Sequence, residues 1–146
     1  MMRRMKCGFT SENRKEEGLC QQLSIGDNLV LANLQEISPG NKVRSELEKQ
    51  FIERQIQDLE IKVADYHLPV SSLSGGNQQK VVVGNWLNTK PNILLMDEPS
   101  RGVDVNAKQQ IFQVMWKAAS EGVSIIMAVS YTHLDVYKRQ GLWSSL

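Results

Sequence analysis

The sequence is poor in cysteine, has no long apolar run and carries no marked excess of charge of either sign. Its two cysteines, Cys7 and Cys20, are too few for a disulfide framework, and no cluster of histidines accompanies them as metal ligands. We therefore expect free thiols and a cytoplasmic protein. No apolar run approaches the ~18 residues of a membrane span. The basic opening MMRRMKCGFT also lacks the apolar core of a signal peptide.

The charge balance argues against proteins that bind polyanions or membrane surfaces. Lysine and arginine together number 17 against 16 aspartate and glutamate, which leaves a net charge of +1. Hydrophobic residues make up 41% of the chain and charged residues 23%, as is typical of a soluble globular protein. The length of 146 residues corresponds to about one domain.

The first two thirds of the chain are predicted to be largely helical. Residues 7–40 alternate short apolar pieces with turn residues. From 41 to about 63, apolar residues recur at roughly helical intervals among many charges, which predicts a surface helix with one buried stripe. A loop containing Pro69 follows, and a second helix is predicted from about Gly75 to Asn88.

From Pro91 onward the pattern predicts a strand, a helix and a second strand. The run NILLMDE is short, apolar and ended by Pro99, which favours a strand buried on both faces of a parallel sheet. Residues 105–121 form an amphipathic helix, and Gly122 stands where a helix commonly ends at a glycine. The run VSIIMAV predicts a second buried strand. Together they form a right-handed β-α-β crossover, so this half belongs to the α/β class.

Two carboxylates, Asp97 and Glu98, end the first of these strands. Ligands of open α/β sheets bind outside the carboxyl ends of the strands. Neighbouring strand residues point to opposite sides, so the two acids should have different roles. One can hold a hard cation such as Mg²⁺ and the other can orient an attacking water, as phosphoryl transfer requires. Taken alone, such a pair more often only ends a strand at the solvent boundary.

The stretch LSGGNQQK, residues 73–80, opens the second helix with a serine and two glycines. Backbone N–H groups at such a helix start commonly face an anion. A phosphate-binding loop of the GxxxxGK[ST] type needs a lysine and a hydroxyl after its last glycine, and neither follows Gly76. That motif occurs nowhere in the sequence. The alternative is a helix start capped by Ser74 that holds no ligand.

LSGGNQQK followed by NILLMDEPSRGVDVNAK resembles the signature motif, Walker B motif and D-loop of an ATP-binding-cassette (ABC) ATPase. The forms GGNQQK and RGVDV resemble the monosaccharide-importer branch of ribose, galactose or xylose type, and SENRKEEGL resembles a segment of its second cassette. The resemblance spans about 6–128. It implies a partial P-loop NTPase fold over 1–128, with a helical signature subdomain at about 20–90 and the Walker B and D-loop β-α-β at 91–128.

The resemblance also implies a role for individual residues. Ser74, Gly75 and Gly76 would contact the γ-phosphate of an ATP held on the opposing cassette. Asp97 would be the carboxylate of the magnesium site, and Glu98 the general base that orients water.

Three further residues are assigned to the nucleotide site by the same resemblance. Asp104 would be the D-loop acid at the interface between cassettes. Glu12 stands where many cassettes have a glutamine that senses the γ-phosphate and couples to the membrane domain, and the change to glutamate leaves that role open. Gln78 is assigned to the nucleotide, with a solvated helix face as the alternative for both Gln78 and Lys80.

The resemblance predicts that the Walker A loop lies upstream of Met1 and that the chain is a later part of a second cassette. We expect such a chain to bind no ATP with useful affinity and to fold poorly by itself, because parallel strands need covering neighbours. Residues 129–146 are expected to be a non-native run-on tail, since SYTHLDVYKRQ resembles a tail that recurs on reading frames cut from metagenomic assemblies. His133 in this tail is expected to be incidental, and His67 structural or exposed.

The implied function is ATP hydrolysis, with ATP and Mg²⁺, at paired cassettes that drive sugar uptake. The implied partners are an opposing cassette, transmembrane permease subunits and, indirectly, a periplasmic or extracellular sugar-binding protein. The implied location is the cytoplasmic face of the bacterial membrane. Nucleic acid is not an expected partner, because no basic arm or coiled-coil insertion occurs. A soluble cassette ATPase acting on nucleic acid or ribosomes is the alternative, as is an inactive truncated product.

Overall fold

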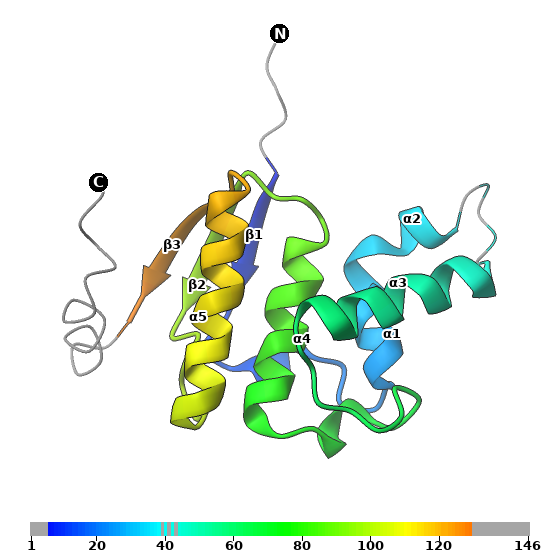
Figure 1. The fold of residues 1–146 in the computed structure, drawn as a ribbon, viewed down its shortest axis with the longest axis horizontal. Coiled ribbons are helices and arrows are strands. Elements are labelled where there is room, and N and C mark those ends of the chain that lie inside the picture. Colours follow the sequence, from blue (N-terminus) through cyan, green and yellow to red (C-terminus); the bar gives the residue numbers. More distant parts are fainter. Residues whose placement is uncertain (1–5, 39, 41, 43, 130–146) are drawn as a thin grey trace, which may run out of the picture.

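The computed structural model describes residues 6–38, 40, 42 and 44–129 (Figure 1). The strands are β1 (Cys7–Thr10), β2 (Ile93–Asp97) and β3 (Ser124–Ala128). The principal helices are α1 (Ile25–Val30), α3 (Ser45–Asp58), α4 (Gly75–Leu87) and α5 (Val105–Ser120). The shorter helical turns are η1 (Arg14–Gly18), η2 (Leu31–Asn33), α2 (Leu34–Ile37) and η4 (Val70–Ser72). His133 and nearly all of the expected run-on tail lie outside the described residues.

The three strands form a parallel sheet in the order β1-β2-β3. Leu94 and Met96 of β2 point to the face that α5 covers, where they share a core with Ile111 and Met115 of that helix. Helix α5 begins at Val105, as predicted, and ends at Ser120, close to the predicted end. Gly122, just beyond it, has a φ of 99°, and its N–H donates a hydrogen bond to the carbonyl of Ala119. The predicted β-α-β crossover is therefore confirmed.

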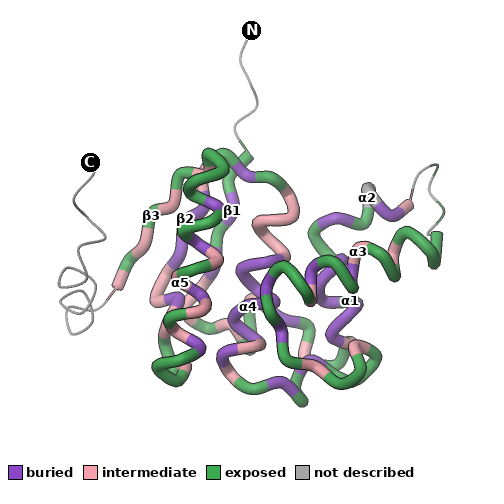
Figure 2. Tube along the Cα trace, viewed as in Figure 1, coloured by how far each residue is buried: buried purple, intermediate pink, exposed green. Residues whose placement is uncertain are grey.

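The opposite face of the sheet corrects the expectation of two fully buried strands. Phe9, Leu95 and Ile126 lie side by side across the three strands on this face. Phe9 is 53% exposed and Ile126 59% exposed, and β3 alternates between exposed and half-buried residues (Figure 2). In the described sheet, α5 covers only the other face, and β3 is an edge strand. The apolar side chains of β3 on this face therefore stay exposed.

Strand β1 was not predicted from the sequence. Its four residues, CGFT, are too few to show a clear alternation, and one of them is Gly8. A Cβ at Gly8 would come 3.0 Å from Leu94 Cδ1 and 3.2 Å from Trp86 Cε3, so glycine allows β1 to approach β2 and α4 closely.

The helical part has a core of its own. Ile25 and Leu29 of α1, Ile52 of α3 and Val82 of α4 are buried together. The charged face of α3 is exposed and carries two ion pairs at i,i+4 spacing, so the predicted surface helix is confirmed. α1 starts at a reciprocal cap, in which Ser24 Oγ accepts from the N–H of Asp27 and the Asp27 carboxylate accepts from the N–H of Ser24.

Helix α4 joins the two cores. In Figure 1 it lies between the sheet and the group formed by α1, α2 and α3. Val82 packs in the helical core, whereas its neighbour Val83 packs against β2 and α5. The start of α4 is consequently placed by both parts of the fold.

The remaining composition-based expectations concern cysteine, histidine and membrane spans. Cys7 and Cys20 are both free and exposed. His67 is exposed in the loop before η4, with its ring centroid 4.5 Å from that of Tyr66. Within the described ranges, no helix combines the length and apolar character needed to cross a membrane.

Candidate functional site

The carboxyl end of β2 presents Asp97 and then Glu98. Glu98 has a φ of 44°, a left-handed conformation that costs a residue with a side chain about 1 kcal/mol or more. The Glu98 N–H donates to the carbonyl of Ala128 over 2.9 Å, so the end of β3 holds this turn. Strained backbone at a ligand-facing edge is frequently part of a functional site.

A cavity of about 580 Å³ opens beside Asp97. It is bounded by the segment that follows β1 and by the turn that follows β2, and its lining residues are Ser11, Glu12, Asn13, Arg14, Lys15, Glu17, Asp97, Arg101 and Gly102. Three of these carry a positive charge and three a negative charge. The cavity is therefore a polar one at the ligand-binding edge of the sheet, where the sequence predicted a site.

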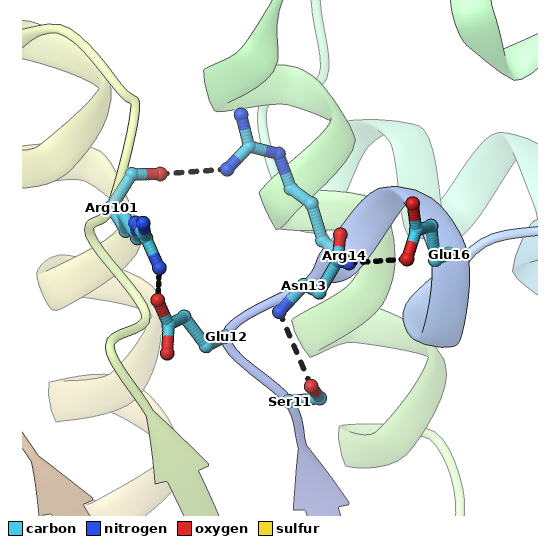
Figure 3. Close-up of polar contacts among 6 residues, drawn as sticks. All are labelled: Ser11, Glu12, Asn13, Arg14, Glu16 and Arg101. Atoms are coloured by element: carbon cyan, nitrogen blue, oxygen red, sulfur yellow. Dashed lines mark hydrogen bonds and ion pairs between the residues drawn. The ribbon is translucent and has the colours of Figure 1, made fainter.

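Glu12 reaches this edge from the segment after β1. Its carboxylate forms an ion pair with Arg101, which lies in the turn after β2 (Figure 3). The Glu12 side chain is 40% exposed and that of Arg101 65% exposed, so the pair contributes at most about 1 kcal/mol to stability. The structure brings Glu12 into the cavity of Asp97, while its sensing role stays a prediction.

Arg14 is a site residue that the sequence reasoning missed. Its Nη1 donates to the carbonyl of Arg101 over 2.7 Å, and its Nη2 donates to the carbonyl of Gly102 over 3.3 Å (Figure 3). Desolvation by burial lowers the pKa of the Arg14 guanidinium below its ordinary value. Arg14 lies within SENRKEEGL, which the resemblance marks as a segment, but its partners could not be predicted because they are main-chain carbonyls 87 and 88 positions away.

Ser74 begins α4 as its N-cap. Its Oγ accepts a hydrogen bond from the N–H of Asn77 over 3.4 Å and another from the Asn77 side-chain amide over 3.2 Å. Ser74 is exposed, so the amino end of this 13-residue helix reaches the surface. Such an end carries about half a positive charge and unpaired N–H groups, which suits it to an anion.

The two glycines after Ser74 are required by close approach. A Cβ at Gly76 would lie 2.2 Å from the Cβ of Ala107 in α5. A Cβ at Gly75 would lie 2.7 Å from Arg14 Nη2 and 3.0 Å from the carbonyl oxygen of Gly102. Both glycines therefore let the start of α4 touch the turn after β2 and the first turn of α5.

Gln78 and Lys80 are both buried, so the interpretation of a solvated helix face is wrong. Gln78 is 4% exposed, and its Nε2 donates to the carbonyl of Leu73 over 3.0 Å, beneath the Ser74 turn. Lys80 is 1% exposed, and its Nζ donates to the carbonyl of Glu60 over 2.8 Å. A direct contact between Gln78 and a nucleotide stays a prediction, and in the structure its amide faces the backbone of the loop.

Asp104 is exposed and caps α5. Its Oδ1 accepts from the N–H of Ala107 over 2.9 Å. In the first turn of the same helix, burial lowers the pKa of Lys108, and the negative charge of Glu98 opposes that shift. The structure thus brings Asp104 and Lys108 to the same edge as Glu98. The interface role of Asp104 stays a prediction.

Comparison with known proteins gives consistent results. A family model described as ABC transporter matches residues 3–101. The chain is 48% identical over 128 residues to the ribose import ATP-binding protein RbsA of Oceanobacillus iheyensis, which covers 86% of this chain and 26% of that protein. It is 47% identical over 119 residues to the xylose import ATP-binding protein XylG of Pseudomonas fluorescens, covering 82% and 23%. The chain spans about a quarter of the length of these curated relatives.

Among solved structures, the chain is similar to a dimeric post-hydrolysis state of the ATP-binding cassette MJ0796 bound to ADP and Pi. The TM-score is 0.67 and the sequence identity 25%, and the match covers 86% of this chain and 52% of that chain. A second dimeric structure of MJ0796, a bacterial ABC transporter cassette, matches with a TM-score of 0.64 at 22% identity, which concerns the fold alone.

Proposed function

Because this chain belongs to the ABC transporter family, with ribose and xylose import ATP-binding proteins among its relatives, we propose that it is part of an ATPase that drives monosaccharide import. Its fold is the predicted α/β fold of an ABC ATPase, a parallel sheet beside a helical part. The observation that carries the proposal is the meeting of two features at one edge: the Asp97 cavity at the end of β2 and the exposed start of α4.

The residues at this edge fit ATP with Mg²⁺. Asp97 offers a half-buried carboxylate in a cavity that also contains the oxygens of Ser11 and Glu12. That pattern suits Mg²⁺, which is usually held by one or two carboxylates together with phosphates and water. When bound, the ion neutralises charge that develops on the phosphates.

Glu98 is the proposed general base. Its backbone is fixed by the bond to Ala128 and by the Arg101 N–H, which donates to the Glu98 carbonyl over 3.0 Å. A carboxylate carried on a backbone held in this way could orient a water next to a phosphate in the neighbouring cavity and accept its proton.

The start of α4 is proposed to act on a second nucleotide, bound by an opposing cassette. Ser74, Gly75 and Gly76 lie at the positive end of the helix, and Gly76 is not directly followed by the lysine and hydroxyl of a phosphate-binding loop. Asp104 lies exposed at the start of α5, where it would face the same partner. The related cassette MJ0796 is dimeric in its solved structures.

The names of the relatives, ribose and xylose import ATP-binding proteins, support a proposal for the larger assembly. We propose that the partners are a second cassette, transmembrane permease subunits and, through them, a sugar-binding protein outside the cell membrane. The chain would then act at the cytoplasmic face of that membrane. Within it, 20–90 would form the helical signature subdomain and 91–128 the Walker B and D-loop part, with 129–146 as a non-native tail.

The proposal can be tested in a hybrid protein, in which residues 6–128 replace the aligned segment of the Oceanobacillus ribose import ATP-binding protein. We expect the hybrid, assembled with the permease subunits of that importer, to hydrolyse ATP and support ribose uptake. Glu98→Gln should lower turnover about 100-fold or more while ATP binding is retained, since general-base catalysis contributes about 10²–10⁴-fold.

The matched control is Glu53→Gln, which removes an exposed carboxylate from α3. A hybrid that binds ATP but turns it over equally well with and without Glu98 contradicts the assignment of the general base. A hybrid that folds and binds ATP without any hydrolysis contradicts the proposed function.

A further inference from the structure

Arg14 connects three segments that are far apart in the sequence. Its two terminal nitrogens donate to the carbonyls of Arg101 and Gly102, in the turn after β2 (Figure 3). Nη2 also lies 2.7 Å from the position that a Cβ at Gly75 would occupy, so the guanidinium touches the first turn of α4. One side chain from the segment after β1 thereby contacts both structures that present the proposed site.

The chemistry of arginine suits this position. A planar guanidinium can donate from two separate nitrogens to two neighbouring carbonyls in a fixed geometry. The ammonium of lysine donates all its N–H groups from one nitrogen and has no such fixed geometry. The turn that carries Arg14, η1, is itself held on α4, because a Cβ at Gly18 would lie 3.1 Å from Cγ2 of Val82. The arginine is therefore fixed at both its backbone and its head group.

This arrangement is poor as a device for stability alone. The Nε of Arg14 is buried and has no hydrogen-bond partner among the described residues. A buried donor without a partner is costly to keep, and the two terminal nitrogens donate to neutral carbonyls. Because this unpartnered donor lowers the stability gained from the contact, we interpret the contact as one that positions the two turns.

We propose that Arg14 is a positioning residue, which fixes the Ser74 turn of α4 relative to the turn formed by Arg101 and Gly102. This inference rests on the proposed function. The two turns lead to the groups expected to face the opposing cassette, the N–H groups of α4 and the carboxylate of Asp104. Both terminal nitrogens of Arg14 donate to main-chain carbonyls, so we assign this residue a positioning role. Arg14 keeps the Ser74 turn and the turn of Arg101 and Gly102 at a fixed position relative to each other when a partner cassette binds against them.

The test in the hybrid protein uses Arg14→Gln, with Arg14→Lys as the conservative variant. We expect Arg14→Gln to lower kcat for ATP about 10- to 100-fold, the scale of loss that a displacement of about 1 Å produces, with KM changed about 2-fold or less. Arg14→Lys should recover only part of the loss. The control is Arg54→Gln, which removes an exposed arginine from an i,i+4 ion pair on α3 and should leave kcat unchanged.

A second readout needs no activity. In the hybrid protein, we expect Arg14→Gln to speed amide hydrogen exchange in 75–78 and in 102–107 together, by about 10-fold, because both segments lose a shared contact. Arg54→Gln should leave both segments unchanged. Equal exchange in the wild-type and Arg14→Gln chains overturns the inference, as does a kcat of the Arg14→Gln hybrid equal to that of the hybrid itself.

The two proposals fail in different ways. If turnover of the hybrid does not depend on Glu98, the proposed function fails, and hydrogen exchange still decides whether Arg14 joins the two turns. If turnover depends on Glu98 but Arg14→Gln behaves like Arg54→Gln, only the role of Arg14 is wrong.

Discussion

The helical part and the sheet of this chain contrast in how completely they bury their apolar residues. Ile25 and Leu29 of α1 are fully buried between α1, α3 and α4. Among the described residues, helix α5 closes one face of the sheet, and Ile126 on the other face is 59% exposed. Figure 2 shows the difference directly, with buried residues along α1 and α4 and exposed or half-buried ones along β3.

The helical part and the sheet make different contributions to the site. The helical part supplies a rigid start for α4, set by a closed core on one side of that helix. The sheet supplies the carboxyl edge that carries Asp97 and Glu98, and Arg14 joins the two at the surface. The following predictions test this contrast in the order of the effect expected.

The largest effect on stability is expected from Ile25→Ala in the helical core. Ile25 has no exposed surface, and removing buried methyl groups typically costs about 2–5 kcal/mol through lost transfer energy and a residual cavity. Urea denaturation of the complete chain, followed by circular dichroism, measures the change.

The matched substitution in the sheet is Ile126→Ala, which removes the same atoms from a largely exposed site. We expect it to change the free energy of unfolding by about 0.5 kcal/mol or less, as surface substitutions usually do. Comparable losses for the two variants would show that the open face of the sheet is covered, and the contrast drawn here would be incorrect.

The two helix caps should differ by a smaller amount. Asp104 receives the N–H of Ala107 over 2.9 Å, whereas Ser74 receives that of Asn77 over 3.4 Å. We expect Asp104→Ala to cost about 1 kcal/mol and Ser74→Ala about 0.5 kcal/mol, within the range measured for N-caps. Urea denaturation provides the comparison, and a larger loss for Ser74→Ala would reverse the ranking of the two caps.

The smallest effect concerns the pH dependence contributed by Lys80. Burial is the main cause that lowers its pKa; Glu60 acts in the opposite direction and Lys62 in the same direction. Because the unfolded chain then binds more protons than the folded chain between the lowered pKa and 10.5, stability should rise with pH in that window. Lys80→Met should flatten this part of the pH profile of urea denaturation, and an unchanged profile would contradict the assignment.

Much of the fold was predictable because its signals are local. α4, β2 and α5 each follow from a run of suitable periodicity bounded by a capping residue, proline or glycine, and the structure confirms them. β1 was missed because four residues around Gly8 carry no such period. The prediction that β3 is buried on both faces was wrong. An apolar run shows that a strand can be buried, but in the described part of the fold α5 covers only one face of the sheet.

Within the candidate site, the acids and the Ser74 turn were predictable from local sequence. The acids follow a strand at its carboxyl end, where α/β sheets bind ligands, and Ser74 precedes a helix, whose start suits an anion. The burial of Gln78 and Lys80 was not predictable, since a polar residue on a helix is normally exposed. The carbonyls of Leu73 and Glu60 accept hydrogen bonds from Gln78 Nε2 and Lys80 Nζ, whereas Gln78 Oε1 is buried without a partner among the described residues.

The amino-acid sequence was enough to predict α4, β2 and α5 and to identify residues that can face a phosphate or a cation. It was enough because helix periods, caps and strand ends are set by neighbours within a few positions. Only the tertiary structure decided that Arg14 would meet the carbonyls of Arg101 and Gly102, and that β1 would pair with β2. Every residue has the same main-chain carbonyl, so the residue types do not indicate which carbonyl a side chain will bond. Only the folded structure shows the partner.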